Sequence, residues 1–170
     1  DDTYVATARL FDLNTLVDAS AAVTDTLNGK HANQHIPQFP GYLKVYDLTG
    51  EERYRQAVEG FWGMVVPGRT YAHGGHGEGE LFGPPSTVAG DIGARNAETC
   101  GTYNMLKLSR LLYFHSLDPK YMEYYERGLL NQVVGSKKNT QSDTNPDVTY
   151  MYGVNPGTRR EYGNTGTCCG

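Results

Sequence analysis

The sequence contains little cysteine, little tryptophan and no long hydrophobic run. Only three cysteines and one tryptophan occur in 170 residues, and no apolar stretch approaches the roughly 18 residues that cross a bilayer. Two of the cysteines, Cys168 and Cys169, are adjacent, and a bridge between neighbouring residues is strained. The composition therefore argues against a disulfide framework and predicts no membrane span.

The chain also lacks basic stretches. Its net charge is −4, and its only Lys/Arg doublets are at 137–138 and 159–160. Proteins that bind nucleic acid usually carry a basic stripe, so we expect no nucleic-acid partner. Hydrophobic residues make up 38% of the chain, which at this length favours one folded domain over a disordered segment. Tyrosine outnumbers phenylalanine by 13 to 5, and its polar tip suits a polar ligand or a wet interface.

Hydrophobic periodicity predicts a mainly helical chain. Pro37 and Pro40 should strain a helix expected at 31–48, which then starts near Pro40. Pro67-Gly68 should end the next helix, expected at 51–66. Residues 68–95 contain seven glycines through Gly90 and an eighth at Gly93; a loop of this length is usually functional. We expect a short strand at 148–152 and helices at 3–11, 13–27, 31–48, 51–66, 97–115 and 118–134.

A faint internal repeat relates two parts of the chain. Residues 31–62 and 98–129 both read as helix, short turn, helix, and Tyr46 and Tyr113 correspond at an offset of 67. Repeated helical hairpins are typical of stacked or toroidal all-α folds. Two or three hairpins are only part of a closed ring, so we expect the apolar faces at Val58, Phe61, Leu108 and Leu112 to be partly exposed or covered by makeshift packing.

All of the cysteines, together with one neighbouring acid, could form a metal site. Cysteine and carboxylate are zinc ligands, and zinc takes four of them in a tetrahedron; the candidates are Glu98, Cys100, Cys168 and Cys169. Residues two apart in the middle of a helix point in nearly opposite directions, so the first two can share a metal only if a helix begins there. The alternative is three buried free thiols and a surface glutamate.

A second group of candidates lies in the Gly-rich loop. Glu78 and Glu80, followed by Glu98, provide paired carboxylates of the kind that perform acid/base catalysis on glycosidic bonds. The alternative is a solvated acidic loop. His73 and His76 flank the pair and are either ligands, general bases or exposed loop residues. Further polar or aromatic candidates for sugar binding, which capping or core packing would equally explain, are 30–34, Arg95, Asn96, Asn104, Tyr71, Tyr103, Tyr121, Tyr124 and Tyr125.

Taken together, these segments resemble the zinc-dependent β-L-arabinofuranosidases of glycoside hydrolase family 127. The resemblance covers nearly the whole chain. It rests, in chain order, on GKHANQHIP, TGEERYRQAVEGFW, RTYAHGGHGEGELFGPP, AETCGTYNMLKLSRLL, DPKYMEYYERGLLNQVVGS, NPGTRREYG and the terminal CCG. It implies a fragment of a catalytic (α/α)6 barrel, with residues 1–170 as a partial domain truncated at both ends. The start at Asp1 and the end at Gly170, directly after the Cys168-Cys169 pair, fit that expectation.

The same resemblance implies a role for each matching residue. Glu80 would be the general acid/base, with Phe82 as its aromatic partner, and Cys168 would be the nucleophile. His31 would contact the substrate. The zinc ligands would be Glu98, Cys100, Cys168 and Cys169.

The implied chemistry is consistent with the residue types. A thiol with a free pKa near 8.5 is mostly protonated at neutral pH, and zinc converts it to a thiolate. A thiolate that attacks the anomeric carbon, with a carboxyl group that protonates the leaving oxygen, gives a retaining mechanism. The chain departs from the family pattern at His35, at Gly101 and at 166–167, none of which is a catalytic position, so the identity of the sugar is the property these departures affect.

Two other functions compete with a retaining glycosidase. One is a non-catalytic, zinc-stabilised helical module, in which Glu80 would have no task. The other is an inactive sugar-binding fragment, and we expect the 170-residue chain alone to lack activity because the barrel's other helices would supply much of the pocket. The expected partner is a carbohydrate, an L-arabinofuranosyl oligosaccharide or glycoconjugate. Substrates of this kind slightly favour an extracellular or periplasmic location over a cytoplasmic one.

Overall fold

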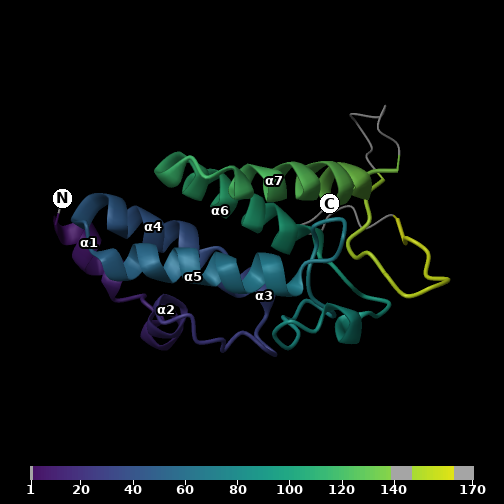
Figure 1. Ribbon diagram of the computed structural model, residues 1–170, viewed down its shortest axis with the longest axis horizontal. Helices are drawn as coiled ribbons and strands as arrows, with labels where there is room; N and C mark the ends of the chain where they lie inside the picture. The colour runs from purple at the N-terminus through teal and green to yellow at the C-terminus, as the bar shows by residue number, and fades with distance from the viewer. Residues whose placement is uncertain (1, 139–146, 163–170) are drawn as a thin grey trace.

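The computed structural model describes residues 2–138 and 147–162, and these form a mainly helical fold (Figure 1). Short 3₁₀ segments lie at Val88–Asp91 (η1) and Val134–Ser136 (η3), and a single π-helical turn, Leu129–Val133 (η2), continues the last helix. The α-helices are α1 Asp2–Arg9, α2 Asn14–Ala21, α3 Ala32–His35, α4 Gln38–Thr49, α5 Glu52–Arg69, α6 Thr99–Ser116 and α7 Pro119–Gly128.

Two helical hairpins form the body of the structure, as the internal repeat predicted. Helix α4 packs on α5, and α6 packs on α7 (Figure 1). Each hairpin turns at a residue in the left-handed conformation, Gly50 (φ 72°) in the first and Leu117 (φ 56°) in the second. Asp118 caps α7 by accepting a hydrogen bond from the Lys120 amide, with Pro119 at the first helical position. The described residues form no closed ring, so the (α/α)6 barrel stays a prediction.

Helix α5 runs through the proline that was expected to end it. Pro67 lies inside the helix, which continues to Arg69. The Arg69 side chain is buried and donates to the carbonyls of Met64 and Gly83 and to the Asp25 carboxylate, 2.6 Å away. These tertiary contacts hold the last turn in place although Pro67 removes one backbone donor, so the predicted end at residue 66 is wrong.

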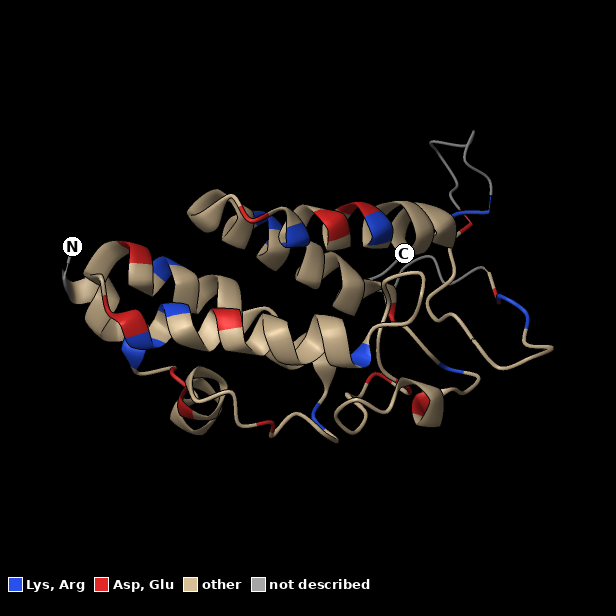
Figure 2. Ribbon diagram, in the orientation of Figure 1, with Lys and Arg blue, Asp and Glu red and all other residues tan. Residues whose placement is uncertain are grey.

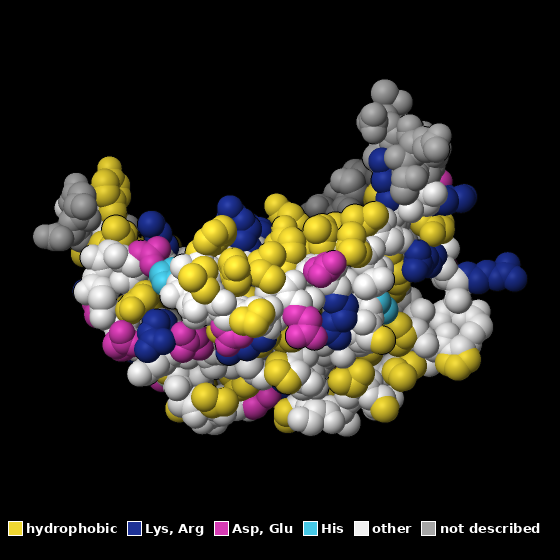
Figure 3. Space-filling view, turned by 45° about the horizontal axis from the view of Figure 1, so that its top comes forward, with side chains coloured by type: hydrophobic (Ala, Val, Ile, Leu, Met, Phe, Trp, Pro, Cys, Tyr) yellow, Lys and Arg dark blue, Asp and Glu magenta, His cyan; other side chains and the backbone are white. Residues whose placement is uncertain are grey.

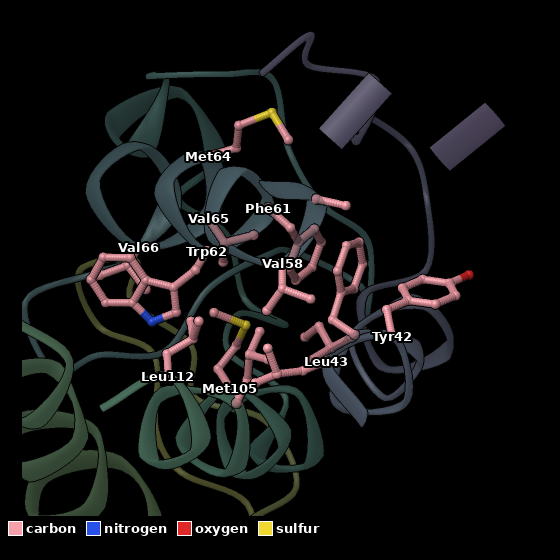
Figure 4. Packing of buried hydrophobic residues seen from close by; sticks show 14 of the residues in the cluster. Tyr42, Leu43, Val58, Phe61, Trp62, Met64, Val65, Val66, Met105 and Leu112 are labelled. Atoms are coloured by element: carbon pink, nitrogen blue, oxygen red, sulfur yellow. The ribbon is translucent and has the colours of Figure 1, made fainter. Parts of the chain in front are cut away.

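The predicted exposure of the hairpin faces is also wrong. Val58, Phe61 and Leu108 are 0% exposed, and Leu112 is 1% exposed. The reason is that α4, α5 and α6 cover one another's apolar faces (Figure 4). Phe61 adds to this cover by stacking on Phe39 with ring centroids 3.7 Å apart.

The large apolar side chains that remain exposed lie in the N-terminal region and the loops, and also on α6 and in the segments before and after α7. A space-filling view shows hydrophobic side chains grouped across one face (Figure 3). Exposed examples on these segments are Tyr103, Phe114, Leu117, Leu130 and Val134. Charged residues of both signs are interspersed along the helices (Figure 2). No helix among the described residues has the length and hydrophobicity needed to span a bilayer.

The long loop between α5 and α6 is irregular, as predicted, and is organised by one buried amide. Asn96, 0% exposed, accepts a hydrogen bond from the Gly93 amide and donates to the Tyr71 hydroxyl and the Asp91 carbonyl, each at 2.7 Å. Asn96 is therefore a structural residue, and its contacts fix the chain just before α6 begins.

The predicted strand at 148–152 is absent from the described residues. Val148 and Thr149 make isolated bridges to Lys137 and Tyr162, and no ladder extends from them. The segment instead follows the start of α6, where the Tyr152 amide donates to the Asn96 carbonyl at 2.7 Å and the Tyr150 carbonyl accepts from the Thr99 amide at 3.2 Å. Its β-type residues satisfy their backbone groups against a loop and a helix end, so no strand forms.

Candidate active site

Two carboxylates, a histidine and a tyrosine converge beside the start of α6. The Tyr150 hydroxyl lies 2.7 Å from Glu80 Oε1 and 3.2 Å from Glu98 Oε1. On the other side of Glu80, its Oε2 lies 3.4 Å from His31 Nε2. Residues that are 70 positions apart along the chain thus share one polar cluster, which we call the carboxylate site (His31, Glu80, Glu98 and Tyr150).

Backbone pairing places His31 next to Glu80. The Glu80 carbonyl accepts from the Ala32 amide at 2.8 Å, and the Phe82 amide donates to the Lys30 carbonyl at 2.9 Å. The glycine-rich loop and the segment before α3 therefore run side by side here. Phe82, 1% exposed, is buried in the core beneath this pairing and anchors the segment that carries the acid.

Glu80 itself has a strained backbone. Its φ is 72°, in the left-handed region that non-glycine residues rarely adopt. Gly77 and Gly79, with φ of 81° and 56°, complete the tight turn that presents the side chain. Strain of about 1 kcal/mol or more at a non-glycine residue persists only where the surroundings enforce it, and such residues concentrate at functional sites.

Helix α6 begins where the proposed metal pair requires it to begin. Glu98 is the N-cap residue, with φ −53° and ψ 128°, and Thr99 is the first helical residue. Glu98 and Cys100 therefore do not lie together in a helix interior, and the geometric condition for sharing a metal is met. Both are buried, at 5% and 8% exposed, which contradicts the alternative of a surface glutamate.

The residue types at this helix start, one carboxylate and one cysteine, are zinc ligands. The structure records Cys100 as disulfide-bonded, so this cysteine would bind zinc only after reduction of that bond. Within 2–138 and 147–162, no group of three or more His, Cys, Asp or Glu is arranged to hold a metal ion. The other two predicted ligands, Cys168 and Cys169, lie outside the described residues. The predicted nucleophile lies there too, because it is the same Cys168.

Burial controls the electrostatics of the carboxylate site. Desolvation raises the pKa of Glu98, and the charge of Glu80 adds to that rise, while the hydrogen bond from Tyr150 and the nearby His31 oppose it. Burial and the hydrogen bond to Glu80 raise the pKa of Tyr150 far above that of a free phenol. Tyr150 therefore stays protonated and serves as a hydrogen-bond donor to the acids.

Tyr150 is the member of the site that sequence reasoning missed. The segment 148–152 reads as a strand, and its alternating tyrosines carry no motif that singles one out. The sequence instead indicates five other tyrosines as sugar contacts. Of these, Tyr71, Tyr121 and Tyr124 are buried and Tyr125 is partly buried, whereas Tyr103 is 54% exposed.

The loop histidines lie outside the carboxylate site. His76 is 3% exposed and stacks on Phe82 with ring centroids 5.4 Å apart, so the expectation of an exposed loop histidine is wrong for this residue. Burial lowers its pKa to about 4. His73 is half-buried beside the rings of Tyr71 and Tyr152, and burial likewise lowers its pKa to about 4. Both are therefore neutral at physiological pH.

Several of the remaining polar candidates make contacts that hold the loop and α6 in place. Asn33 and Asn104 are joined by a 2.8 Å hydrogen bond, which ties the segment at His31 to α6. The Glu78 carboxylate accepts from the Arg95 amide at 3.2 Å. Glu78 is thus occupied with loop structure, whereas Glu80 carries the contacts of the site.

Comparisons with known proteins identify the family. Residues 1–170 match the family described as "Beta-L-arabinofuranosidase, GH127 catalytic domain". Among solved structures, "The GH127, Beta-arabinofuranosidase, BT3674" is similar with a TM-score of 0.65 and 23% identity, covering 80% of this chain and 23% of that chain. A "Glycoside hydrolase" is similar with a TM-score of 0.60 and 19% identity, covering 82% of this chain and 26% of that chain. No curated protein matches the chain.

The chain spans about a quarter of the length of these two solved structures. At such low identities the likeness to them shows a shared fold, and the family assignment comes from the match over residues 1–170. The chain belongs to the GH127 β-L-arabinofuranosidase catalytic-domain family, a family of glycoside hydrolases.

Proposed function

We propose that this chain forms part of the active site of a retaining glycoside hydrolase that cleaves β-L-arabinofuranosides, with Glu80 as general acid/base. The observation that carries the proposal is the carboxylate site. A strained turn presents Glu80 between His31 Nε2 at 3.4 Å and the Tyr150 hydroxyl at 2.7 Å. A structural loop would not need an acid held in this way. The sugar type follows from the family description.

In this proposal, Glu80 protonates the oxygen of the departing group and then takes a proton from water in the second step. His31 faces the same carboxylate and contacts the sugar. Tyr150 holds Glu80 in one orientation through its hydrogen bond, which restricts the acid to the position from which it transfers the proton. The position of such a group relative to the substrate contributes as much to the reaction rate as its chemical identity does.

Cys168 is the proposed nucleophile, and its sulfur displaces the leaving group at the anomeric carbon to give a thioglycosyl intermediate. The residues that would hold zinc are Glu98, Cys100, Cys168 and Cys169. When bound, zinc keeps cysteine thiols ionised at neutral pH. The support from the described residues is the burial of Glu98 and Cys100 at the start of α6, with Cys100 in its reduced form rather than the disulfide-bonded form of this structure.

The proposed substrate is an L-arabinofuranosyl oligosaccharide or glycoconjugate. Such a substrate fits a site built from carboxylates, histidine and tyrosine, because sugar hydroxyls both donate and accept hydrogen bonds.

The test is hydrolysis of β-L-arabinofuranosides by the longest form of the protein that contains residues 1–170. Glu80→Gln should slow turnover strongly on substrates with poor leaving groups and much less on activated aryl glycosides, which need little protonation. Glu78→Gln is the matched control in the same loop and should be milder, because Glu78 holds the Arg95 amide. Equal losses on both substrate types after Glu80→Gln would indicate damage to folding and contradict the proposed role.

Metal content tests the second half of the proposal. We expect one zinc per protein molecule by elemental analysis, lost in Cys100→Ala. Cys168→Ala should abolish hydrolysis. We further expect the 170-residue chain alone to be inactive, and robust hydrolysis by this purified chain, abolished by Cys168→Ala, would contradict that expectation.

A further inference from the structure

The arginines of this chain divide into two groups. Seven of the nine are engaged by a carboxylate or an aromatic ring. Arg9, Arg53, Arg55 and Arg69 form ion pairs. Arg110, Arg127 and Arg160 lie over the rings of Phe114, Tyr124 and Tyr152. Within the described residues, the side chains of Arg95 and Arg159 have neither kind of partner.

These two arginines line the same cavity. It has a volume of about 760 Å³, and its walls include Arg95, Thr149, Tyr150, Thr158, Arg159 and Glu161. The volume lies within the range of sites that take small ligands, roughly 300 to 1,000 Å³. Two arginines that lie apart in the sequence, at 95 and 159, thus line one hollow, and neither forms an ion pair with a carboxylate of the described residues.

The cavity adjoins the proposed acid through one side chain. Tyr150 forms part of its wall, and the hydroxyl of the same residue lies 2.7 Å from Glu80 Oε1. A general acid protonates the oxygen of the leaving group, so the part of a substrate that departs lies on the acid's side of the scissile bond. A cavity one residue from Glu80 is placed to hold the next sugar of that leaving group.

The charges around the cavity favour an anion. Arg95 and Arg159 carry two positive charges, and among the described residues of the wall Glu161 is the one acid. The Glu78 carboxylate accepts from the Arg95 backbone amide and lies outside ion-pair distance of its guanidinium. The chain as a whole has a net charge of −4, so this local excess of positive charge runs against its overall charge. A guanidinium fork matches a carboxylate or sulfate, two oxygens at a time.

We propose that this cavity binds an anionic sugar residue on the leaving-group side, its charge carried by a uronate carboxylate or a sulfate ester. The location relative to the scissile bond rests on the proposed function, whereas the binding itself does not. Tyr150 supplies an aromatic surface for the sugar ring, Thr149 and Thr158 supply hydroxyl groups at the wall, and the two arginines select the charge.

Titration calorimetry on the chain tests the binding. The probes are digalacturonate, galactose 6-sulfate and neutral galactobiose, at low and at high ionic strength. At low salt we expect at least one anionic sugar to bind about tenfold or more tighter than the neutral disaccharide, with the preference shrinking as salt screens the charges. The first two probes identify which anion is preferred.

Substitutions locate the preference. Arg95→Gln and Arg159→Gln should each reduce the affinity for the preferred anion by about tenfold and leave the neutral sugar unaffected. Arg110→Gln is the matched control, because Arg110 lies over Phe114 on α6, and it should leave the preference intact. Equal binding of anionic and neutral sugars, or the same loss in the Arg110 control, would overturn the proposal.

Hydrolysis separates this proposal from the proposed function. In the longest form of the protein, an arabinofuranosyl-galacturonate substrate should have a kcat/KM about tenfold higher than its galactose counterpart. Hydrolysis of both without that difference would overturn the cavity proposal alone. Anion binding without hydrolysis would leave the cavity proposal standing and count against the proposed reaction.

Discussion

The Tyr150 hydroxyl donates a 2.7 Å hydrogen bond to Glu80 Oε1 and thereby joins the glycine-rich loop to a segment 70 residues further along the chain. The same hydroxyl lies 3.2 Å from Glu98 Oε1. One phenol thus stands between two acids with different proposed tasks, one in proton transfer and one in metal binding. Its proton can be donated to only one of them at a time, and the shorter distance assigns it to Glu80.

Removing this hydroxyl should reduce catalysis more than it reduces stability. A hydrogen bond to a charged group is worth about 1.5–3 kcal/mol, so Tyr150→Phe should lower kcat by roughly tenfold to a hundredfold while KM changes little. Kinetics on the longest form of the protein measure the effect. Tyr103→Phe is the control, because Tyr103 is 54% exposed on α6. A rise in KM with kcat unchanged would show that Tyr150 contributes to substrate binding only.

The strained backbone at Glu80 predicts a difference between two substitutions that both remove its carboxylate. Glycine adopts a φ of 72° without penalty, whereas alanine does not. Glu80→Gly should therefore be more stable to unfolding than Glu80→Ala by about 1 kcal/mol. Urea denaturation of the two variants measures this difference. Equal stability would mean that the turn relaxes when the side chain is absent.

Close packing between α2 and α5 predicts contrasting effects of alanine at two glycines of α5. A Cβ at Gly60 would lie 2.1 Å from the Ser20 carbonyl oxygen, whereas a Cβ at Gly63 would meet no atom within 4 Å. Gly60→Ala should lower the free energy of unfolding by about 1–3 kcal/mol, because the added methyl group overpacks the contact between the helices. Gly63→Ala should be neutral or stabilising by up to about 1 kcal/mol. Thermal unfolding of the pair provides the measurement, and similar shifts in both would refute the close approach of the helices.

Buried His76 predicts a loss of stability in mild acid. Burial lowers its folded-state pKa from 6.5 to about 4, so the unfolded chain binds a proton first as the pH falls. The stabilisation is fully present above pH 6.5 and declines as the pH falls toward about 4, by at most about 3 kcal/mol. His76→Phe, which keeps a ring against Phe82, should reduce the decline in urea denaturation curves across this range. Part of the decline should remain, because burial also lowers the pKa of His73 to about 4. An unchanged pH profile would contradict the assignment to His76.

A second acid-sensitive contact acts at lower pH and can be separated from the first. The Asp25 carboxylate accepts from Arg69 at 2.6 Å, and although burial opposes the effect, the hydrogen bonds lower its folded-state pKa below 3.8. Its stabilisation is therefore present above the unfolded-state pKa and is lost only as the pH falls below about 4. Most of the decline assigned to His76 should therefore occur at a higher pH than the loss assigned to Asp25.

Local features of the sequence determined most of the helices and the candidate catalytic residues. The 3.6-residue periodicity predicted α4 to α7 to within a few residues, and the Asp118-Pro119 pair marked the start of α7. The glycine spacing predicted the long loop. These signals depend on neighbouring residues only, so they can be read without knowing the rest of the fold. The family resemblance rested on the same local segments, and the match over residues 1–170 confirmed it.

Only the tertiary structure decided which distant residues meet. Pro67 ends a helix by local rules, yet α5 continues because Asp25 and Gly83 hold Arg69. Tyr150 reaches Glu80 because its backbone docks on the start of α6, which no pattern within 148–152 indicates. Burial and long-range pairing depend on how loops close and helices stack. That information is spread over the whole chain and is absent from any single segment.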